Sequence, residues 1–384
     1  MKKRAKLGII ANEFFDPTIS RIGGFGMLSR QISRCAESLV DFPLSVQLFH
    51  GAPPPGATLP RRVYGRPLHR PRGNWRGEKY TLLFSGARPD VWLSVDYRPN
   101  YEYFLLMFQS APLIMWVQDP KTPEDWERIS TCRVPGSEYA EPQGLGFIDC
   151  TPLSKLVESR IALGARTIFS VPSSFLIQKI ESTYNVAPES VATLCYPMEP
   201  LPRSYSKAET PVVTFLGRLD PQKRPWIAAE IAARMPDVRF QFMGKSHFSG
   251  PGSWSPQGLP PNIEVLGHLD GRVKAERLGA SWIMLNTSIH EGLPISFVEG
   301  LQNQAPIVSC VDPEGVVSRF GHYVGEFRGG GMESVPAFVS ALRSLIESDA
   351  KRLAAGQAGQ RWAAENHSQS KFASQLSSLL MGLG

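Results

Sequence analysis

The sequence predicts an α/β protein of two domains, each built on a parallel sheet, with a crevice between them. Its 384 residues, 42% of them hydrophobic, exceed what one ordinary core takes up and suit two domains. Short apolar runs alternate with helix-like segments along the chain, which is the pattern of parallel sheets. Residues 197–210 are rich in proline and lack periodicity, so we expect them to link the domains.

In the first half, near-continuous apolar runs such as residues 7–11 are typical of strands buried on both faces. The expected strands are 7–11, 44–49, 90–95, 112–117, 167–171 and 191–195, and the expected helices are 24–39, 152–163 and 173–183.

The alternation resumes after the linker. The expected strands are 212–216, 238–243, 263–266, 281–285 and 306–310, and the expected helices are 224–235, 270–280, a short one from Pro294 to about 302, 333–347, 350–365 and 368–381. We therefore place the domain boundaries at 1–204 and 205–365.

Composition excludes several classes of protein. The net charge of +6 is modest and no basic block with interleaved aromatics dominates, so we expect no nucleic-acid partner. Five scattered cysteines without a C-x-x-C pair fit a reducing cytosol and give no metal site. No run of 18 apolar residues occurs, so we expect no membrane span and a cytoplasmic location.

Residues 50–79 contain a run of three prolines and then a basic stretch at 61–79, and we expect them to form a long surface loop. The basic stretch contains seven cations and almost no acid, namely Arg61, Arg62, Arg66, Arg70, Arg72, Arg76 and Lys79. One interpretation is a solvated loop. The other is contact with an acidic acceptor or with the anionic inner face of a membrane, which would make the protein peripheral to it.

The stretch from Glu291 to Glu299 predicts an anion site beside sugar-binding carboxylates. Gly292 permits close approach of a ligand or a positive φ, and Pro294 suits a first helical turn. The N–H groups of Leu293, Ile295 and Ser296 then become unpaired donors at a positive helix end. Glu291 and Glu299 would accept hydroxyl groups of a sugar. A capping and a solvated glutamate are the structural alternative.

Two cations follow the strand 212–216. Gly217 and Arg218 come directly after the strand, and Lys223 five residues later, so both cations are expected over one sheet edge. Together they suit a diphosphate, whose charge grows when a bond to it breaks. No Asp-x-Asp pair is present to hold Mg²⁺, so we expect no metal.

The first half offers two weaker candidates. Gly24 lies in a glycine-rich turn between a strand and a helix, where backbone can approach an anion or simply turn tightly. Asp119 follows the strand 112–117, at the end that faces the ligand crevice in such sheets. A helix-capping role for Asp119 is the alternative.

The second half resembles the donor half of the retaining GT-B glycosyltransferases of family 4, the glycosyl transferases group 1. The resemblance covers about 210–330 and rests on four elements in order: Gly217-Arg218…Lys223, Met243-Gly244-Lys245, Asn262…Leu266-Gly267 and the E-x7-E spacing of Glu291-Gly292-Leu293-Pro294…Glu299. It implies two Rossmann-like domains with parallel sheets facing across a crevice. It also implies that the last helix, 366–384, returns to the first domain.

Carried over by position, the resemblance assigns a role to each candidate. Arg218 and Lys223 would hold the donor diphosphate, Glu299 the ribose hydroxyls and Glu291 the donor sugar. The amides of Leu293 and Ile295 would bind phosphate or sugar oxygens. The remaining donor-binding candidates are Gly24, Gly217, Gly244, His268 and Gly292. Many members carry a histidine where this chain reads Gln118-Asp119, so Asp119 is our prediction for the residue that assists the acceptor.

The function implied is transfer of a sugar from a nucleoside diphosphate-sugar, which we expect to be a UDP-sugar, to an acceptor hydroxyl with retained configuration. The acceptor is a glycan, a lipid-linked sugar or a small molecule. No prosthetic group is expected, and the oligomeric state is open. The alternatives are a non-catalytic nucleotide-sugar sensor of the same fold, or a same-fold epimerase or phosphorylase.

Overall fold

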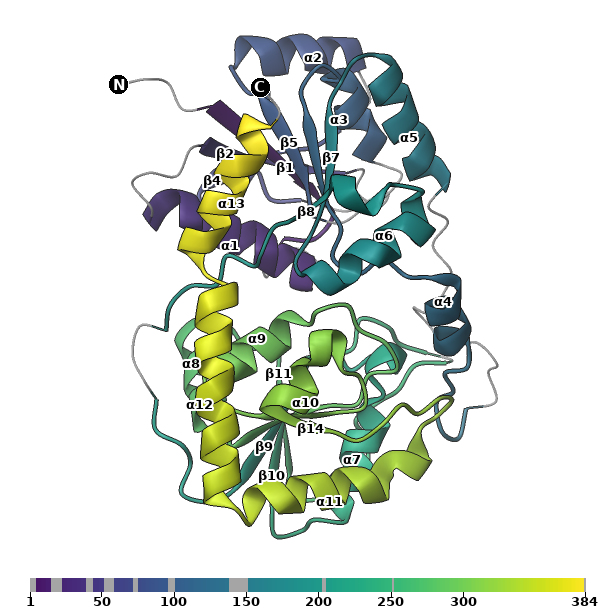
Figure 1. Cartoon of the computed structure of the whole chain (residues 1–384), viewed down its shortest axis with the longest axis vertical. Helices are drawn as coiled ribbons and strands as arrows, with labels where there is room; N and C mark the ends of the chain where they lie inside the picture. The colour runs from purple at the N-terminus through teal and green to yellow at the C-terminus, as the bar shows by residue number, and fades with distance from the viewer. Residues whose placement is uncertain are drawn as a thin grey trace. The chain divides into compact units, whose positions relative to one another are not determined.

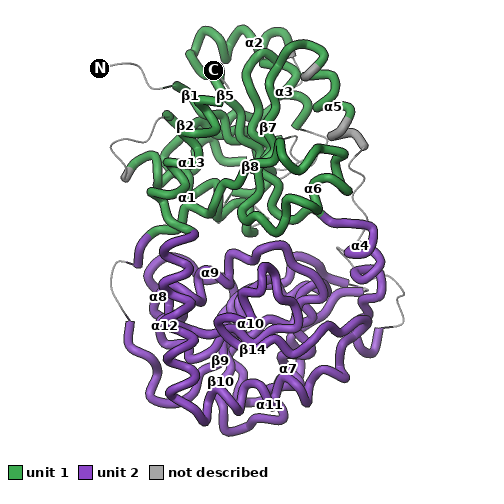
Figure 2. Tube along the Cα trace, viewed as in Figure 1, with its two compact units in different colours: residues 1–120, 149–199, 367–384 green, residues 121–148, 200–366 purple. Residues whose placement is uncertain are grey.

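The chain forms two compact units in a computed structural model (Figures 1 and 2). The model describes residues 5–14, 23–38, 44–51, 59–71, 75–95, 101–137, 151–201, 205–250 and 252–382. Unit 1 comprises 1–120, 149–199 and 367–384, and unit 2 comprises 121–148 and 200–366. Residues 121–148 thus group with unit 2 although they precede residue 204. The boundaries 1–204 and 205–365 stay a prediction.

Unit 1 is built on a sheet in which eight described strands have the order β3-β4-β2-β1-β5-β6-β7-β8. Only the short β3–β4 pair is antiparallel among these. The strands are β1 (Ala5–Ala11), β2 (Leu44–His50), β3 (Arg62–Val63), β4 (Arg66–His69), β5 (Val91–Ser94), β6 (Leu113–Trp116), β7 (Thr167–Val171) and β8 (Val191–Thr193). In the central β1, Ile9 lies between Leu48 and Leu93, and all three are fully buried. This explains the uninterrupted apolar pattern of the strand.

The described helices of unit 1 surround this sheet (Figure 1). They are α1 (Gly24–Ser38), α2 (Trp75–Phe84), α3 (Glu102–Met107), α5 (Thr151–Ala162), α6 (Ile177–Tyr184) and α13 (Gln369–Met381), with 3₁₀ turns η2 (Ser174–Leu176) and η3 (Pro188–Ser190). The C-terminal α13 belongs to this unit, because the ring of Phe372 packs 5.7 Å from that of Trp116 and Gln375 Oε1 accepts the Cys195 N–H at 2.8 Å.

The predicted surface loop at 61–79 is wrong in its described part. Residues 62–63 and 66–69 are strands, and α2 begins at 75. Leu68 pairs with Leu48 of β2 and is buried, which makes β4 a true strand of the sheet, with only the two-residue β3 outside it. Arg66 donates to Val46 O and ion-pairs with Glu37, so this cation is used inside unit 1. Pro67 and the basic residues around it hid the strand from pattern analysis, because a strand next to the sheet edge tolerates both.

Unit 2 is built on a sheet of six parallel described strands in the order β11-β10-β9-β12-β13-β14. They are β9 (Val212–Leu216), β10 (Arg239–Met243), β11 (Ile263–Gly267), β12 (Ile283–Asn286), β13 (Ile307–Ser309) and β14 (Gly321–Tyr323). The chain builds outward from β9 through β10 to β11, then crosses back to β12 on the other side of β9. The sheet therefore has its switch point between β9 and β12, where ligands bind in open α/β sheets.

Helices pack around this sheet over a core that includes Phe215, Ile227, Phe242, Leu285 and Phe338. The described helices are α4 (Pro123–Ser130), α7 (Pro225–Ala233), α8 (Gly271–Ala280), α9 (Ile295–Gln302), α10 (Val316–Phe320), α11 (Val335–Ile346) and α12 (Asp349–Asn366), with 3₁₀ turns η4 (Pro221–Lys223), η5 (Pro313–Gly315) and η6 (Met332–Ser334). No helix in the described ranges is long and apolar enough to cross a bilayer.

The expected fold class, an α/β protein with two parallel sheets, is confirmed. Sequence reasoning missed the short elements β3, β4, β14, α2, α3, α4 and α10. Most of these elements are too short to show the hydrophobic periodicity of a helix or a strand.

Candidate functional site

The candidates of unit 2 follow the carboxyl ends of four neighbouring strands. Gly217 and Arg218 follow β9, Gly244 follows β10, His268 follows β11, and Glu291 lies in the loop after β12. Because carboxyl ends of parallel strands meet at one edge, the structure brings these residues to the same side of the sheet. The loops after β9 and β12 flank the switch point, which is the position expected of a ligand site.

Lys223 and Glu291 form an ion pair between these two flanking loops, Nζ to Oε1. The side chain of Lys223 also passes over Gly217, where an added Cβ would lie 3.9 Å from its Cγ and Cδ. The structure therefore joins a glycine, a cation and a carboxylate that sequence analysis had placed in one site.

The Glu291 carboxylate is buried, and donors converge on its Oε1. Besides Lys223, the Ser288 hydroxyl donates at 2.6 Å and the Asn286 amide at 3.2 Å. Burial opposes the charge, but the Lys223 ammonium and these hydrogen bonds outweigh it, so the pKa of Glu291 lies below its ordinary value. Glu291 is therefore an anion at neutral pH, suited to accept hydroxyl groups and unsuited to donate a proton.

Arg218 is partly exposed and held by a neighbour. Its Nη1 lies 3.1 Å from Oδ2 of the buried Asp220, while Asp220 Oδ1 accepts the His247 N–H at 2.9 Å. Asp220 thus keeps a guanidinium at the sheet edge with part of its surface available to solvent.

Backbone hydrogen bonds join the loops along this edge. Gly217 N–H donates to Met243 O at 3.1 Å, and Gly244 N–H donates to Gly267 O at 2.7 Å. Gly244 has φ +151°, and a Cβ there would lie 1.8 Å from Gly217 O. The glycine is required for this close approach, which is a structural reason for it that stands whatever Gly244 binds.

Helix α9 presents an uncapped N-terminus beside Glu291. Pro294 is the N-cap, with φ −65° and ψ 130°, so it precedes the helix instead of opening its first turn. No side chain caps α9, and the N–H groups of Ile295 and Ser296 have no acceptor among the described residues. Gly292 does not take a positive φ, so the left-handed alternative for it is excluded. The N–H groups remain suited to an anion.

Glu299 is paired with a lysine that sequence analysis did not single out. Its Oε1 lies 2.5 Å from Lys274 Nζ of α8, and both side chains are largely buried. Figure 1 shows α8 and α9 side by side in unit 2. His268 is exposed at the end of β11.

Sequence patterns also did not indicate Arg224, a buried residue that holds the loops of the site together. It is fully buried in a left-handed conformation with φ +46°. Its guanidinium donates to Thr287 O at 2.8 Å, Phe327 O at 2.8 Å and Ser288 O at 3.3 Å, and Thr287 Oγ1 donates back to Lys223 O at 2.7 Å. The loops that carry Lys223 and Glu291 are thereby tied together. A second cation directly after Lys223 was the only sequence signal.

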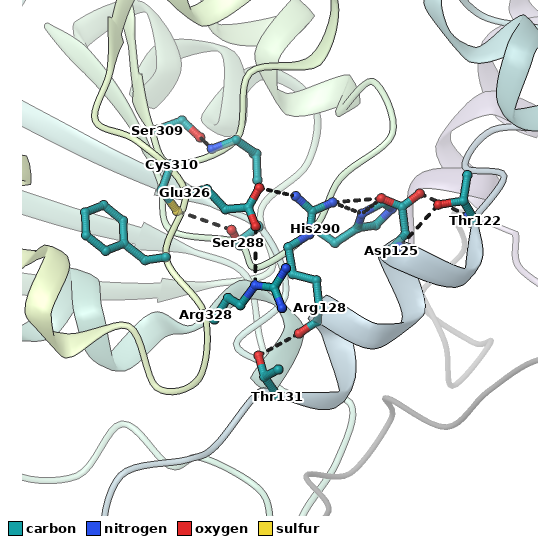
Figure 3. A network of polar contacts seen from close by, with 12 residues as sticks. Thr122, Asp125, Arg128, Thr131, Ser288, His290, Ser309, Cys310, Glu326 and Arg328 are labelled. Carbon is teal, nitrogen blue, oxygen red and sulfur yellow. Dashed lines mark hydrogen bonds and ion pairs between the residues drawn. The ribbon is translucent and has the colours of Figure 1, made fainter.

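His290 is buried against α4, a helix from the 121–148 segment (Figure 3). Its Nδ1 lies 3.1 Å from Arg128 Nη2 and 3.3 Å from Asp125 Oδ1. The N-cap of α4 is Thr122, which forms a capping box with Asp125. Asp119 is therefore not the cap of this helix, and the capping interpretation of Asp119 is wrong for α4.

The candidates of unit 1 lie where sequence analysis expected them within that unit. Gly24 is the first residue of α1, and Asp119 follows β6 in a half-buried position. His50 ends β2, with its Nδ1 2.6 Å from Gly51 O, and burial lowers its pKa. A charged role for His50 is therefore disfavoured.

These features define the class of protein. The two parallel-sheet units have the fold of the GT-B glycosyltransferases. Residues 199–362 match the family model "Glycosyl transferases group 1", and this part of the chain is a domain of that family. It includes every candidate from Gly217 to Glu299.

Solved structures share the fold over nearly the whole chain. Sucrose-phosphate synthase from Thermosynechococcus elongatus has 12% identity and a TM-score of 0.69, covering 99% of each chain. HepE from Anabaena, in complex with UDP-glucose, has 14% identity and a TM-score of 0.66, covering 98% of this chain and 99% of that one. WaaG, a glycosyltransferase involved in lipopolysaccharide biosynthesis, has 12% identity and a TM-score of 0.60, covering 98% and 100%. No curated protein sequence matches the chain.

Proposed function

We propose that the protein transfers a sugar from a nucleoside diphosphate-sugar to an acceptor hydroxyl, with retention of the anomeric configuration. The single observation that carries the proposal is the Lys223–Glu291 pair at the switch point, beside the uncapped start of α9. A cation, a sugar-accepting carboxylate and free N–H donors are what a sugar diphosphate requires. A sheet that is merely structural needs none of them there.

In the proposed site, Arg218, Lys223 and the N–H groups of Ile295 and Ser296 bind the diphosphate. Glu291 accepts hydroxyl groups of the donor sugar and Glu299 those of the ribose. Charge grows on the diphosphate as the bond to the sugar breaks, so prearranged cations stabilise the transition state more than the ground state. These groups do what a metal ion would do, and we propose that the reaction needs none.

Retention follows if the acceptor attacks the face that the leaving group departs from. A phosphate oxygen then takes the acceptor proton, and no side chain has to act as a strong base. Asp119 is our candidate for orienting the acceptor hydroxyl from unit 1, and Gly24 for approaching the diphosphate. Both roles rest on sequence position.

We propose a UDP-sugar as the donor, supported by the UDP-glucose complex of the structurally similar HepE. The acceptor is a glycan, a lipid-linked sugar or a small molecule. The test begins with thermal shifts in UDP, GDP, ADP, CDP and dTDP. Ligand at 100 times its dissociation constant adds about 2.7 kcal/mol of stability. The corresponding sugar nucleotides are then incubated without acceptor, in the presence and absence of EDTA.

Slow release of nucleoside diphosphate that EDTA does not reduce supports a metal-independent transferase. Tight binding without any turnover would instead support the alternative of a nucleotide-sugar sensor, and interconversion of the sugar without release would support an epimerase. A phosphorylase would consume sugar polymer with inorganic phosphate. An absence of binding to all five diphosphates would contradict the proposal.

We also propose peripheral contact with an anionic membrane, through α2 and the basic 61–79 segment. Helix α2 exposes Tyr80, Leu83 and Phe84, the last by 88%, and Arg76 is exposed one turn before Tyr80. Exposed aromatics with basic neighbours suit an anionic bilayer surface. Vesicles of phosphatidylglycerol and phosphatidylcholine should sediment the protein more than phosphatidylcholine alone.

In the same assay Phe84→Ser should abolish the difference, whereas Leu353→Ser, which changes another exposed residue, should not. Equal sedimentation with both vesicle types would contradict membrane contact. A concentration-dependent dimer that Phe84→Ser dissociates would assign the surface to a second copy of the chain.

A further inference from the structure

Helix α4 is part of unit 2 by its packing. Ile129, Cys132 and Val134, on and directly after the helix, are buried in the core of that unit. The Cys132 thiol lies 3.4 Å from Pro221 O, and Gly329 N–H donates to Thr131 Oγ1 at 2.9 Å. The 121–137 segment is therefore fixed to the domain that carries the candidate donor site.

The polar face of α4 forms a charged cluster in which Asp125 and His290 are buried and Arg128 is largely buried (Figure 3). Asp125 accepts from Arg128 Nη2 at 2.8 Å and from the Thr122 N–H at 3.1 Å, and Arg128 Nη1 lies 3.1 Å from Glu326 Oε2. The ring of His290 completes the cluster. Burying charges is costly, and an apolar replacement usually stabilises as well or better. A charged cluster at this position is therefore better explained by what it positions than by stability.

The cluster and Cys132, just after α4, together contact both loops that flank the switch point. His290 directly precedes Glu291. Pro221, which Cys132 contacts, lies two residues before Lys223. Between the loops, Ile289 N–H donates to Gln222 O at 3.0 Å, and Gln222 Nε2 donates to His290 O at 3.2 Å. A displacement of α4 would therefore act on Lys223 and Glu291 together, without touching a ligand.

We propose that α4 is a positioning element of the donor site, in which Asp125 and Arg128 hold His290 so that Lys223 and Glu291 keep the geometry that binds a diphosphate. The identity of the ligand rests on the proposed function. The mechanical part of the proposal, that α4 holds the loops of Lys223 and Glu291 in place, does not. Asp125, Arg128 and His290 are positioning residues. The nucleoside half of the ligand, assigned to Glu299 and its partner Lys274, lies outside this cluster.

The mechanical part is tested by amide hydrogen exchange without ligand. Arg128→Met removes the contacts to Asp125, His290 and Glu326, and Arg128→Lys keeps the charge but not the three-way geometry. We expect exchange at Ile289 to accelerate at least tenfold in Arg128→Met and less in Arg128→Lys. Arg343→Met, which breaks an exposed ion pair with Asp237 in the same unit, is the matched control and should change nothing at Ile289. Unchanged exchange in Arg128→Met would overturn the proposal.

The functional part is tested by titrating UDP, GDP and ADP, and their nucleosides, by NMR. Arg128→Met should raise the Kd of the bound diphosphate at least tenfold and leave the Kd of its nucleoside within twofold. Equal weakening of both would overturn positioning, because general loosening of unit 2 weakens both. If the wild type binds none of the diphosphates while exchange at Ile289 still accelerates, the proposed function fails and the mechanical role of α4 stands.

Discussion

Lys223 and Glu291 neutralise each other across the switch point of the second sheet, although 68 residues separate them in the chain. Each of the two groups is thus the other's partner in this structure. We expect a diphosphate to draw Lys223 partly away from Glu291, because the ligand offers the lysine a stronger anion. Glu291 Oε1 would then keep only Ser288 and Asn286 as donors, and the carboxylate could accept a sugar hydroxyl in place of the lysine. Binding of the diphosphate would thus prepare binding of the sugar.

Replacing Lys223 by Met should lower both turnover and stability, each for its own reason. We expect kcat to fall by about 10²–10³, because one stabilising contact to the leaving group is lost. Stability should fall by about 3 kcal/mol, because Glu291 is left buried without its cation. Steady-state kinetics and denaturant unfolding measure the two effects. Full activity in this variant would contradict the assignment.

The double variant Lys223→Met/Glu291→Gln is the control for that stability loss. With both charges removed, the free energy of unfolding should return to within about 1 kcal/mol of wild type, since an ion pair replaced by neutral groups costs little. Turnover should stay low. Recovery of activity together with stability would mean that the pair serves only the fold.

Glu299→Ala should weaken binding of the donor more than it slows turnover of the bound donor. We expect KM for the sugar nucleotide to rise about tenfold with a smaller change in kcat, because ribose contacts are made equally in the ground and transition states. Lys274→Met also breaks the Glu299–Lys274 pair but leaves the carboxylate, and it is the matched comparison. A similar KM for Glu299→Ala and Lys274→Met would indicate that donor binding depends on the ion pair and not on the carboxylate itself.

Gly244→Ala should destabilise unit 2 strongly. The new Cβ would lie 1.8 Å from Gly217 O, and that backbone is held by the β9–β10 pairing. We expect a loss of about 3 kcal/mol or more, roughly 6 °C or more in Tm. Gly258→Ala, at φ +63° with open space around its Cβ, should cost only about 1 kcal/mol. Equal effects of the two substitutions would contradict the close approach at Gly244.

Acid should destabilise the first unit through His367. Burial, followed by the nearby Lys371, lowers the pKa of His367 from 6.5 to about 3. Its Nδ1 accepts the Tyr196 N–H at 3.2 Å, and its ring stacks on Tyr196 at 5.2 Å. The unfolded chain takes up the proton near pH 6.5 and the folded one does not. The stabilisation is therefore complete above pH 6.5 and is lost as pH falls toward 3, by about 2 kcal/mol at pH 5.

Denaturant unfolding at pH 7.5, 6 and 5 measures this loss. His367→Phe keeps an aromatic ring against Tyr196 and should have lower stability at pH 7.5 but a flatter dependence between pH 6.5 and 5. His322→Gln, which changes an exposed histidine, should retain the wild-type slope. The lowered pKa of Glu291 acts below pH 4.5 and does not overlap this window. An unchanged slope in His367→Phe would contradict the assignment.

The strands that carry the fold could be predicted because burial on both faces leaves a continuous apolar pattern, as in β1 and β9. The candidates after β9 and β12 could be found because polar residues after such strands share one sheet edge. Strand β4, next to the sheet edge, was hidden by Arg66 and Pro67. Helix α4 was also missed, although its capping box, Thr122 with Asp125 three residues later, was readable.

The contacts within the site could not be predicted. Arg224 is buried because carbonyls of residues 287, 288 and 327 converge on it, and no local pattern announces such a convergence. The pairing of Lys274 with Glu299 likewise depends on how α8 lies beside α9. Sequence patterns specify which strand end a residue follows, whereas its partner is decided by packing.

A crystal structure with the bound nucleoside diphosphate tests the central claim most directly. We expect phosphate oxygens within hydrogen-bonding distance of Lys223 Nζ, the Arg218 guanidinium and the N–H groups of Ile295 and Ser296. A diphosphate bound elsewhere, with Lys223 still paired to Glu291 and no ligand atom at the start of α9, would contradict it.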